Sequence, residues 1–103
     1  LSNAIDSLHT DQAHSISDVV PQLTLEHYQS FPSLLATVPT ERQIALLEIF
    51  RQLGAYEIEH NREAQISKQQ LAEIIGAIID SNENESVRVE AYAVGSYLNR
   101  IER

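Results

Sequence analysis

The chain has no cysteine among its 103 residues. This absence excludes disulfide bonds, thiolate catalysis and zinc sites built on cysteine, and it fits a reducing cytoplasm better than a small secreted scaffold. No run of about 18 apolar residues is present, so the sequence predicts no membrane-spanning helix. No basic stretch followed by an apolar one opens the sequence, so we expect no signal peptide. We therefore predict a cytoplasmic protein that does not bind membranes.

Basic and aromatic residues are also few. Seven Lys and Arg stand against fifteen Asp and Glu, which gives a net charge of −8. An acidic surface repels phosphates and anionic lipid headgroups, and it favours basic protein partners. Four Tyr, two Phe and no Trp leave a core built mainly from Ile, Leu, Val and Ala. The 43% hydrophobic content is sufficient for one modest core in a chain of this length.

The N-terminal part of the chain lacks a periodic apolar pattern. We interpret residues 1–23 as a flexible polar arm and residues 24–103 as a single helical domain. Thr24 is placed to cap a first short helix, which Pro32 interrupts because proline cannot continue the hydrogen-bond ladder. Pro32 then occupies a favoured first position of a second short helix. The sequence therefore predicts two short helices within residues 24–37.

The first long helix is predicted over residues 40–62. Thr40 and Gln43 have the spacing of a capping box. One narrow polar stripe follows the helix, and apolar side chains occupy most of the remaining circumference, so we expect a central helix that is buried on several sides. Gly54 inside this helix costs about 1 kcal/mol relative to Ala and indicates close packing or a kink. The polar stripe consists of Glu41, Glu48, Gln52 and Glu59.

The second long helix is predicted over residues 68–80. Ser67 and Gln70 form a second capping-box pair, and Ile66 with Leu71 has the spacing of a hydrophobic staple. The apolar positions fall on one face of a 3.6-residue period, and Glu73 lies opposite them. This pattern predicts a helix with one buried and one solvated face. The apolar positions are Leu71, Ile74, Ile75, Ile78 and Ile79.

The third long helix is predicted over residues 84–102. Asn82 and Glu85 offer a further capping-box spacing. An apolar seam with steps of 4, 3, 4 and 3 residues favours a helix over the strand that the alternation of its first residues imitates. The seam consists of Val87, Ala91, Val94, Leu98 and Ile101, and a milder apolar face opposite it contains Val89, Tyr92, Ala93 and Ser96. The chain is thus predicted to be an all-α protein, a small helical bundle.

Residues 67–76 look like the opening of a DNA-binding helix-turn-helix, with a polar start, a Leu-Ala pair and Gly76. That motif requires a turn soon after the glycine and then a basic recognition helix. Residues 77–79 instead continue the apolar stripe, and acids follow at Asp80, Glu83 and Glu85. The basic residues are scattered at Arg42, Arg51, Arg62, Lys68, Arg88, Arg100 and Arg103. These observations argue against a nucleic-acid partner.

Signatures of catalysis are sparse. The three glycines are far apart, so no phosphate-binding loop is present. Glu57 and His60 form an E-x-x-H pair, but a di-iron bundle site requires two such pairs and two further glutamates. Similar spacings at Asp6 and His9, and at Asp11 and His14, lie in the unpatterned arm. We interpret His60 and its neighbouring acids as a hydrated polar helix end, and we predict no enzymatic activity, metal or cofactor.

The surplus of apolar helix surface is the main functional signal. We predict a non-enzymatic protein–protein interaction module that forms a homodimer through its last helix and regulates or inhibits a partner with a basic surface. The alternative is a helix-turn-helix-like DNA-binding regulator that uses residues 67–90. The predicted interaction residues are Val87, Val89, Ala91, Tyr92, Ala93, Val94, Leu98 and Ile101.

Overall fold

The computed structural model describes residues 23–60 and 66–101. These residues confirm the predicted all-α class, because the described chain is helical and contains no strand. The predicted arm lies outside the described residues except for Leu23, which is buried in the core. The helices are α3 (Leu25–Gln29), α4 (Phe31–Leu35), α5 (Thr40–Glu59), α6 (Lys68–Ser81) and α7 (Glu85–Arg100).

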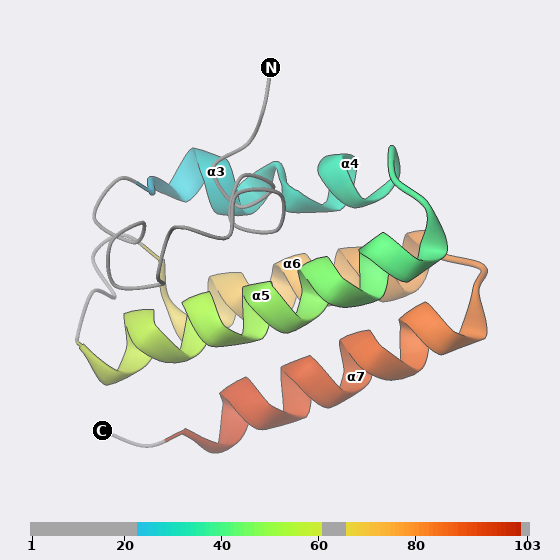
Figure 1. Cartoon of the computed structure of the whole chain (residues 1–103). Helices are drawn as coiled ribbons and strands as arrows, with labels where there is room; N and C mark the ends of the chain where they lie inside the picture. Colours follow the sequence, from blue (N-terminus) through green and yellow to red (C-terminus); the bar gives the residue numbers. More distant parts are fainter. Residues whose placement is uncertain (1–22, 61–65, 102–103) are drawn as a thin grey trace.

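The helices form a layered bundle (Figure 1). Helices α5 and α6 lie in the middle, α3 and α4 cover one side, and α7 lies on the other side. Helices α5 and α7 run in the same direction, and α6 runs in the opposite direction. The closest backbone contacts of α7 are with both α5 and α6. Helix α4 makes its closest contacts with α6, and α3 makes its closest contacts with α4 and α6.

The polar stripe and most apolar positions of helix α5 have the burial that the sequence predicts. Its polar stripe faces outward: Glu41, Gln52 and Glu59 are exposed and Glu48 is half-buried. The other sides bury the helix's apolar residues, which explains why a helix with little polar surface is stable in this bundle. The buried apolar side chains are Leu46, Leu47, Phe50, Leu53, Ala55 and Ile58.

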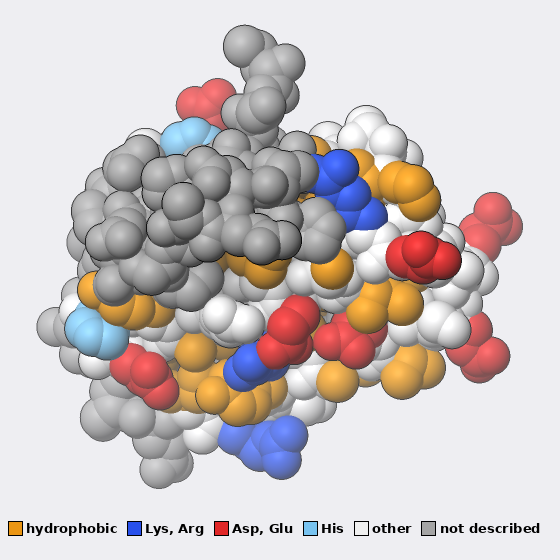
Figure 2. All heavy atoms as spheres, in the orientation of Figure 1, with side chains coloured by type: hydrophobic (Ala, Val, Ile, Leu, Met, Phe, Trp, Pro, Cys, Tyr) orange, Lys and Arg blue, Asp and Glu red, His pale blue; other side chains and the backbone are white. Residues whose placement is uncertain are grey.

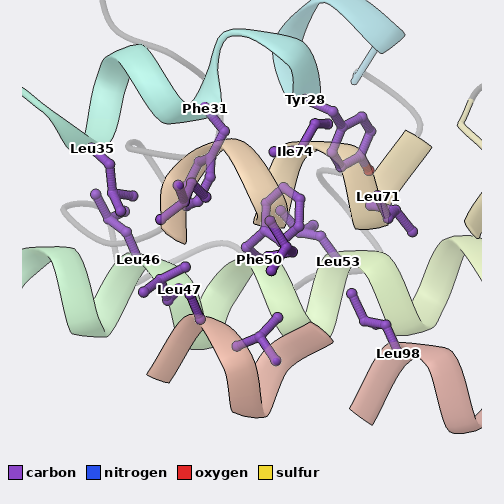
Figure 3. Close-up of a cluster of buried hydrophobic side chains, with 14 of the residues drawn as sticks. Tyr28, Phe31, Leu35, Leu46, Leu47, Phe50, Leu53, Leu71, Ile74 and Leu98 are labelled. Carbon is purple, nitrogen blue, oxygen red and sulfur yellow. The ribbon is translucent and has the colours of Figure 1, made fainter. Parts of the chain in front are cut away.

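Aromatic rings join the short helices to α5. The ring of Phe31 stacks on Phe50 with centroids 4.6 Å apart, and Tyr28 meets Phe50 edge-on at 6.2 Å. All three side chains are fully buried, and Figure 3 shows them converging on one interior together with leucines from α4 to α7. Buried aromatic pairs contribute about 0.5–1.5 kcal/mol beyond their area. This contact therefore anchors α3 and α4, which are too short to be stable alone.

The caps of α3 and α6 follow the prediction. The Gln70 N–H donates to Ser67 Oγ at 3.1 Å, and the Ser67 N–H donates to Gln70 Oε1 at 2.8 Å, which completes the capping box. Ile66 and Leu71, the predicted staple, are both buried. At α3, the Thr24 N–H donates to Nδ1 of His27 at 3.0 Å, so a histidine takes the position that Glu or Gln usually occupies.

The caps predicted for α5 and α7 are wrong. Thr40 is the first helical residue of α5, and Gln43 Nε2 donates to the Leu35 carbonyl, 2.7 Å away at the end of α4. At α7 the capping residue is Asn84, whose Oδ1 accepts from the N–H groups of Ser86 and Val87 at 2.9 and 3.3 Å. Asn82 ends α6 instead. Spacing alone does not distinguish these cases, because several polar residues in one turn compete for the same N–H groups.

Gly54 permits α5 and α7 to approach closely. A Cβ atom at this position would lie 3.0 Å from both terminal methyl groups of Leu98 and 3.6 Å from a methyl group of Leu71. The predicted role of Gly54 in close packing is therefore confirmed. Gly95 permits a slightly less close approach of α7 to α6, since a Cβ atom at this position would lie 3.3 Å from the Ile75 side chain. Gly76 has open space around it.

A buried polar contact joins α3 to α5. The Tyr28 hydroxyl donates to the Glu57 carboxyl group, and both residues have zero exposure. Glu57 was predicted to be part of a hydrated helix end, and this was wrong. A signal was present in the sequence: Leu46, Phe50, Leu53 and Glu57 follow steps of 4, 3 and 4 residues, so Glu57 occupies a core position of the helix.

We predict that Gly76→Ala raises the free energy of unfolding by about 1 kcal/mol, because the helix gains a better former and the new methyl group meets no neighbour. Gly54→Ala gives the same gain in propensity but overpacks Leu98, which costs about 1–3 kcal/mol. Urea unfolding followed by circular dichroism should therefore give Gly76→Ala a free energy of unfolding about 1–3 kcal/mol higher than that of Gly54→Ala. Equal stability of the two variants would contradict the close approach.

Tyr28→Phe should lower the free energy of unfolding by about 1–3 kcal/mol, because it removes the donor to a buried carboxyl group and preserves the ring packing. Tyr56→Phe is the matched control, since Tyr56 is only half-buried on α5. We expect the control to change stability by less than about 0.5 kcal/mol. Equal losses in the two variants would show that the Tyr28 hydroxyl has no special role.

Candidate interaction surface

The eight interaction residues predicted from sequence do not share one surface. Half of them are buried within this chain, where the side chain of Leu98 reaches Gly54 of α5. Ile101 is half-buried. The seam therefore packs α7 against its own neighbours, and a second molecule cannot reach it while the bundle is folded. The buried residues are Val87, Ala91, Val94 and Leu98.

The remaining predicted residues lie on the solvent side of α7. Val89 is 61% exposed, Tyr92 is 57% exposed, and Ala93 is exposed as well. Tyr97, which was not among the predicted residues, is 38% exposed. Among the described residues, Val89, Tyr92 and Tyr97 are the exposed large hydrophobic side chains, and all three belong to α7. Single exposed apolar residues are ordinary on a protein surface, whereas these three side chains lie on one helix.

The outer face of α7 is defined here by residues that recur at helical spacing and are all exposed. Glu85 and Arg100 lie at its two ends, and the apolar side chains lie between them. Figure 2 shows hydrophobic side chains interspersed with acidic and basic ones over α5 and α7. The residues of the outer face are Glu85, Val89, Tyr92, Ala93, Ser96 and Arg100.

A charged cluster borders this face on the α5 side. The Arg51 guanidinium donates to the Glu48 carboxylate, with Nε 3.0 Å from Oε1. The Cζ atom of Arg51 lies 4.7 Å from the centre of the Tyr97 ring. This hydrogen bond lowers the pKa of Glu48 below its ordinary value and raises the pKa of Arg51. The cation–π contact holds the half-exposed Tyr97 ring at the margin of the outer face.

The two ends of α7 carry opposite charges. Glu83 and Glu85 are exposed at the N-terminal end, where negative charge complements the helix dipole. At the C-terminal end, Lys68 Nζ donates to the carbonyls of Asn99 and Ile101 at 3.1 and 2.6 Å, and Arg100 is exposed beside it. Helix α7 is therefore acidic at its start and basic at its end.

Residues 67–90 lack the turn that a helix-turn-helix opening at Ser67 would place soon after Gly76. Helix α6 continues through Gly76 to Ser81 without a turn. The ammonium group of Lys68 is hydrogen-bonded to the end of α7, so it contributes to the fold. Arg88 is exposed, but Glu83 and Glu85 precede it at the start of the same helix. The segment therefore lacks a basic face for phosphates.

The E-x-x-H pair of α5 is split between the core and the surface. Glu57 is buried against Tyr28, whereas His60 is exposed and its ring stacks on Tyr56 with centroids 3.9 Å apart. In the described ranges, no three His, Asp or Glu side chains come together in a group that could hold a metal ion. The pairs at Asp6 and Asp11 lie outside these ranges.

Two hollows of about 260 Å³ each lie beside α4 and α6. One is lined by Pro32, Gln43 and Glu83, among others, at the end of α6. The other lies between α4 and α6 and includes Gln29 and Glu73. Each hollow has a single carboxylate and no basic side chain in its lining, so neither pairs an acid with a base for proton transfer.

Among the residues that the structure places, no helix has both the length and the apolar character needed to cross a membrane.

Comparison of the chain with protein-family models, curated protein sequences and solved structures finds no match. The comparisons therefore add no family to this description.

Proposed function

We propose that this protein is a non-enzymatic interaction module that forms a homodimer through the outer face of α7 and regulates or inhibits a partner protein. The observation that carries this proposal is the concentration of exposed large hydrophobic side chains on α7, where Val89, Tyr92 and Tyr97 lie. Tyrosine is enriched at protein interfaces because its ring provides apolar area and its hydroxyl remains solvated or hydrogen-bonded.

The size of the outer face sets the expected strength of association. A contact formed mainly by one helix from each molecule falls at the small end of specific interfaces, below about 1,200 Å². We therefore expect a reversible dimer with a micromolar dissociation constant rather than an obligate one. Partial exposure of the apolar residues in a monomer is consistent with such an equilibrium, because the bundle already has its own core.

The acidic surface supports a partner with basic chemistry. The net charge is −8, and exposed carboxylates are distributed over every long helix. Such a surface accelerates encounter with a basic protein and repels nucleic acid. A dimer doubles this charge, which suits a regulator or inhibitor that covers a basic surface. The exposed acids of the long helices and the loop before α7 are Glu41, Glu59, Glu73, Asp80, Glu83 and Glu85.

Protein interaction is favoured over DNA binding through residues 67–90. A recognition helix requires basic and amide side chains directed at the groove, whereas α7, the helix that follows α6, begins with Glu85 behind Glu83 and has Arg88 as its one basic side chain up to residue 90. We place the protein in the cytoplasm in this proposal, because a chain without cysteine suits a reducing compartment.

Tyr92→Lys should weaken the dimer by at least about tenfold in dissociation constant, because it places a charge within the contact and removes an apolar ring. Gln29→Lys adds the same charge at an exposed position of α3, on the other side of the bundle (Figure 1), and should leave the dimer unchanged. Sedimentation equilibrium or light scattering at several concentrations measures both variants. Thermal unfolding should be similar for both, since each side chain is exposed. A wild-type protein that remains monomeric at all concentrations would refute the proposal.

A further inference from the structure

The outer face of α7 is complementary to itself when one copy is reversed. Its two charges are at opposite ends, Glu85 in the first turn and Arg100 in the last turn. Tyr92 and Ala93 lie at the midpoint between these charges. A two-fold axis through this midpoint places Glu85 level with Arg100 of the second copy, and Val89 level with Ser96 of the second copy. Closed dimers require such a self-complementary surface.

The charges favour this direction over the parallel one. In a parallel pair, Glu85 would face Glu85 of the second copy, and Arg100 would face its own equivalent. An antiparallel pair replaces these two repulsions with two opposite-charge contacts, and it also opposes the dipoles of the two helices. Lys68, which is hydrogen-bonded at the end of α7, adds to the basic end. Glu83 adds to the acidic end.

We infer that two copies of this chain pair through antiparallel α7 helices, with Tyr92 and Ala93 at the two-fold axis and Glu85 of each copy against Arg100 of the other. This inference rests on the proposed self-association and specifies its geometry. The small side chain of Ala93 allows close approach of the two helices at the axis, and Tyr92 supplies the largest apolar contact there.

The flanks of α7 are compatible with this arrangement. Glu90 is half-buried on the side where Arg51 contacts Tyr97, so it lies away from the middle of the outer face. Arg88 is exposed on the opposite flank, toward α6, and the axis does not bring it near its own equivalent. The axis therefore brings neither Glu90 nor Arg88 opposite the same residue of the second copy.

Cysteine cross-linking tests the direction, and the chain is suited to it because it contains no native cysteine. In an antiparallel pair, Ala93→Cys lies at the axis and should form a disulfide-linked dimer by itself. Glu85→Cys and Arg100→Cys should each fail to cross-link alone, since their equivalents lie at opposite ends of the dimer. A mixture of these two variants should cross-link. Gln29→Cys, on α3 at the other side of the bundle (Figure 1), is the control that should not cross-link in any mixture.

Charge reversal tests the ion pairs. Glu85→Arg and Arg100→Glu should each raise the dissociation constant of the dimer by about tenfold, because two attractive contacts become repulsive. An equimolar mixture of the two variants should recover the wild-type constant as a heterodimer. Glu73→Arg is the matched control: it reverses an exposed acid of α6 that lies on the side of α4, and it should leave the constant unchanged.

The outcomes separate this inference from the proposed function. A wild-type dimer whose Glu85→Cys and Arg100→Cys variants each cross-link with themselves would establish a parallel pair and overturn the inference. A wild-type dimer in which neither the cysteine nor the charge variants have an effect would place the interface elsewhere and overturn it as well. A wild-type monomer at all concentrations would remove the self-association on which the inference rests.

Discussion

The packing of α7 against both α5 and α6 is the constraint on which the rest of the structure depends. Helices α5 and α6 make their closest backbone contacts with α7 rather than with each other. The absence of a side chain at Gly54 allows the Leu98 methyl groups to fill the space beside α5. Lys68 then ties the start of α6 to the end of α7 through two carbonyls. Removing this helix would expose the faces of both of its neighbours.

This packing decides which part of α7 is available to a partner. Residues three and four positions apart lie on the same face of a helix. One face of α7 is buried in the core through Val87, Ala91, Val94 and Leu98, so the opposite face is exposed to solvent. That opposite side contains Val89 and Tyr92 between an acid and a base. The same helix therefore stabilises the monomer with one face and supports the proposed contact with the other.

On the side of α5 that faces α3, the carboxyl group of Glu57 is buried in the apolar core. Tyr28 and Phe31 pack on Phe50, and the Tyr28 hydroxyl meets Glu57 one turn beyond the leucines of α5. A buried carboxyl group requires hydrogen-bond partners, so this contact constrains how α3 lies across the bundle. Glu57 is therefore buried, whereas His60, which completes the E-x-x-H spacing three residues later, is exposed.

Local pattern by itself determined the all-α class, the long helices to within a few residues, the cap at Ser67 and the polar stripe of α5, because these features depend on periodicity and on neighbours in the chain. Tertiary structure decided the pairing of Glu57 with Tyr28 and the division of α7 into a buried and an exposed face. Each of these depends on contacts between residues far apart in sequence. A single helix with two apolar faces does not specify which face its own chain covers, because that depends on the shape of the space between α5 and α6.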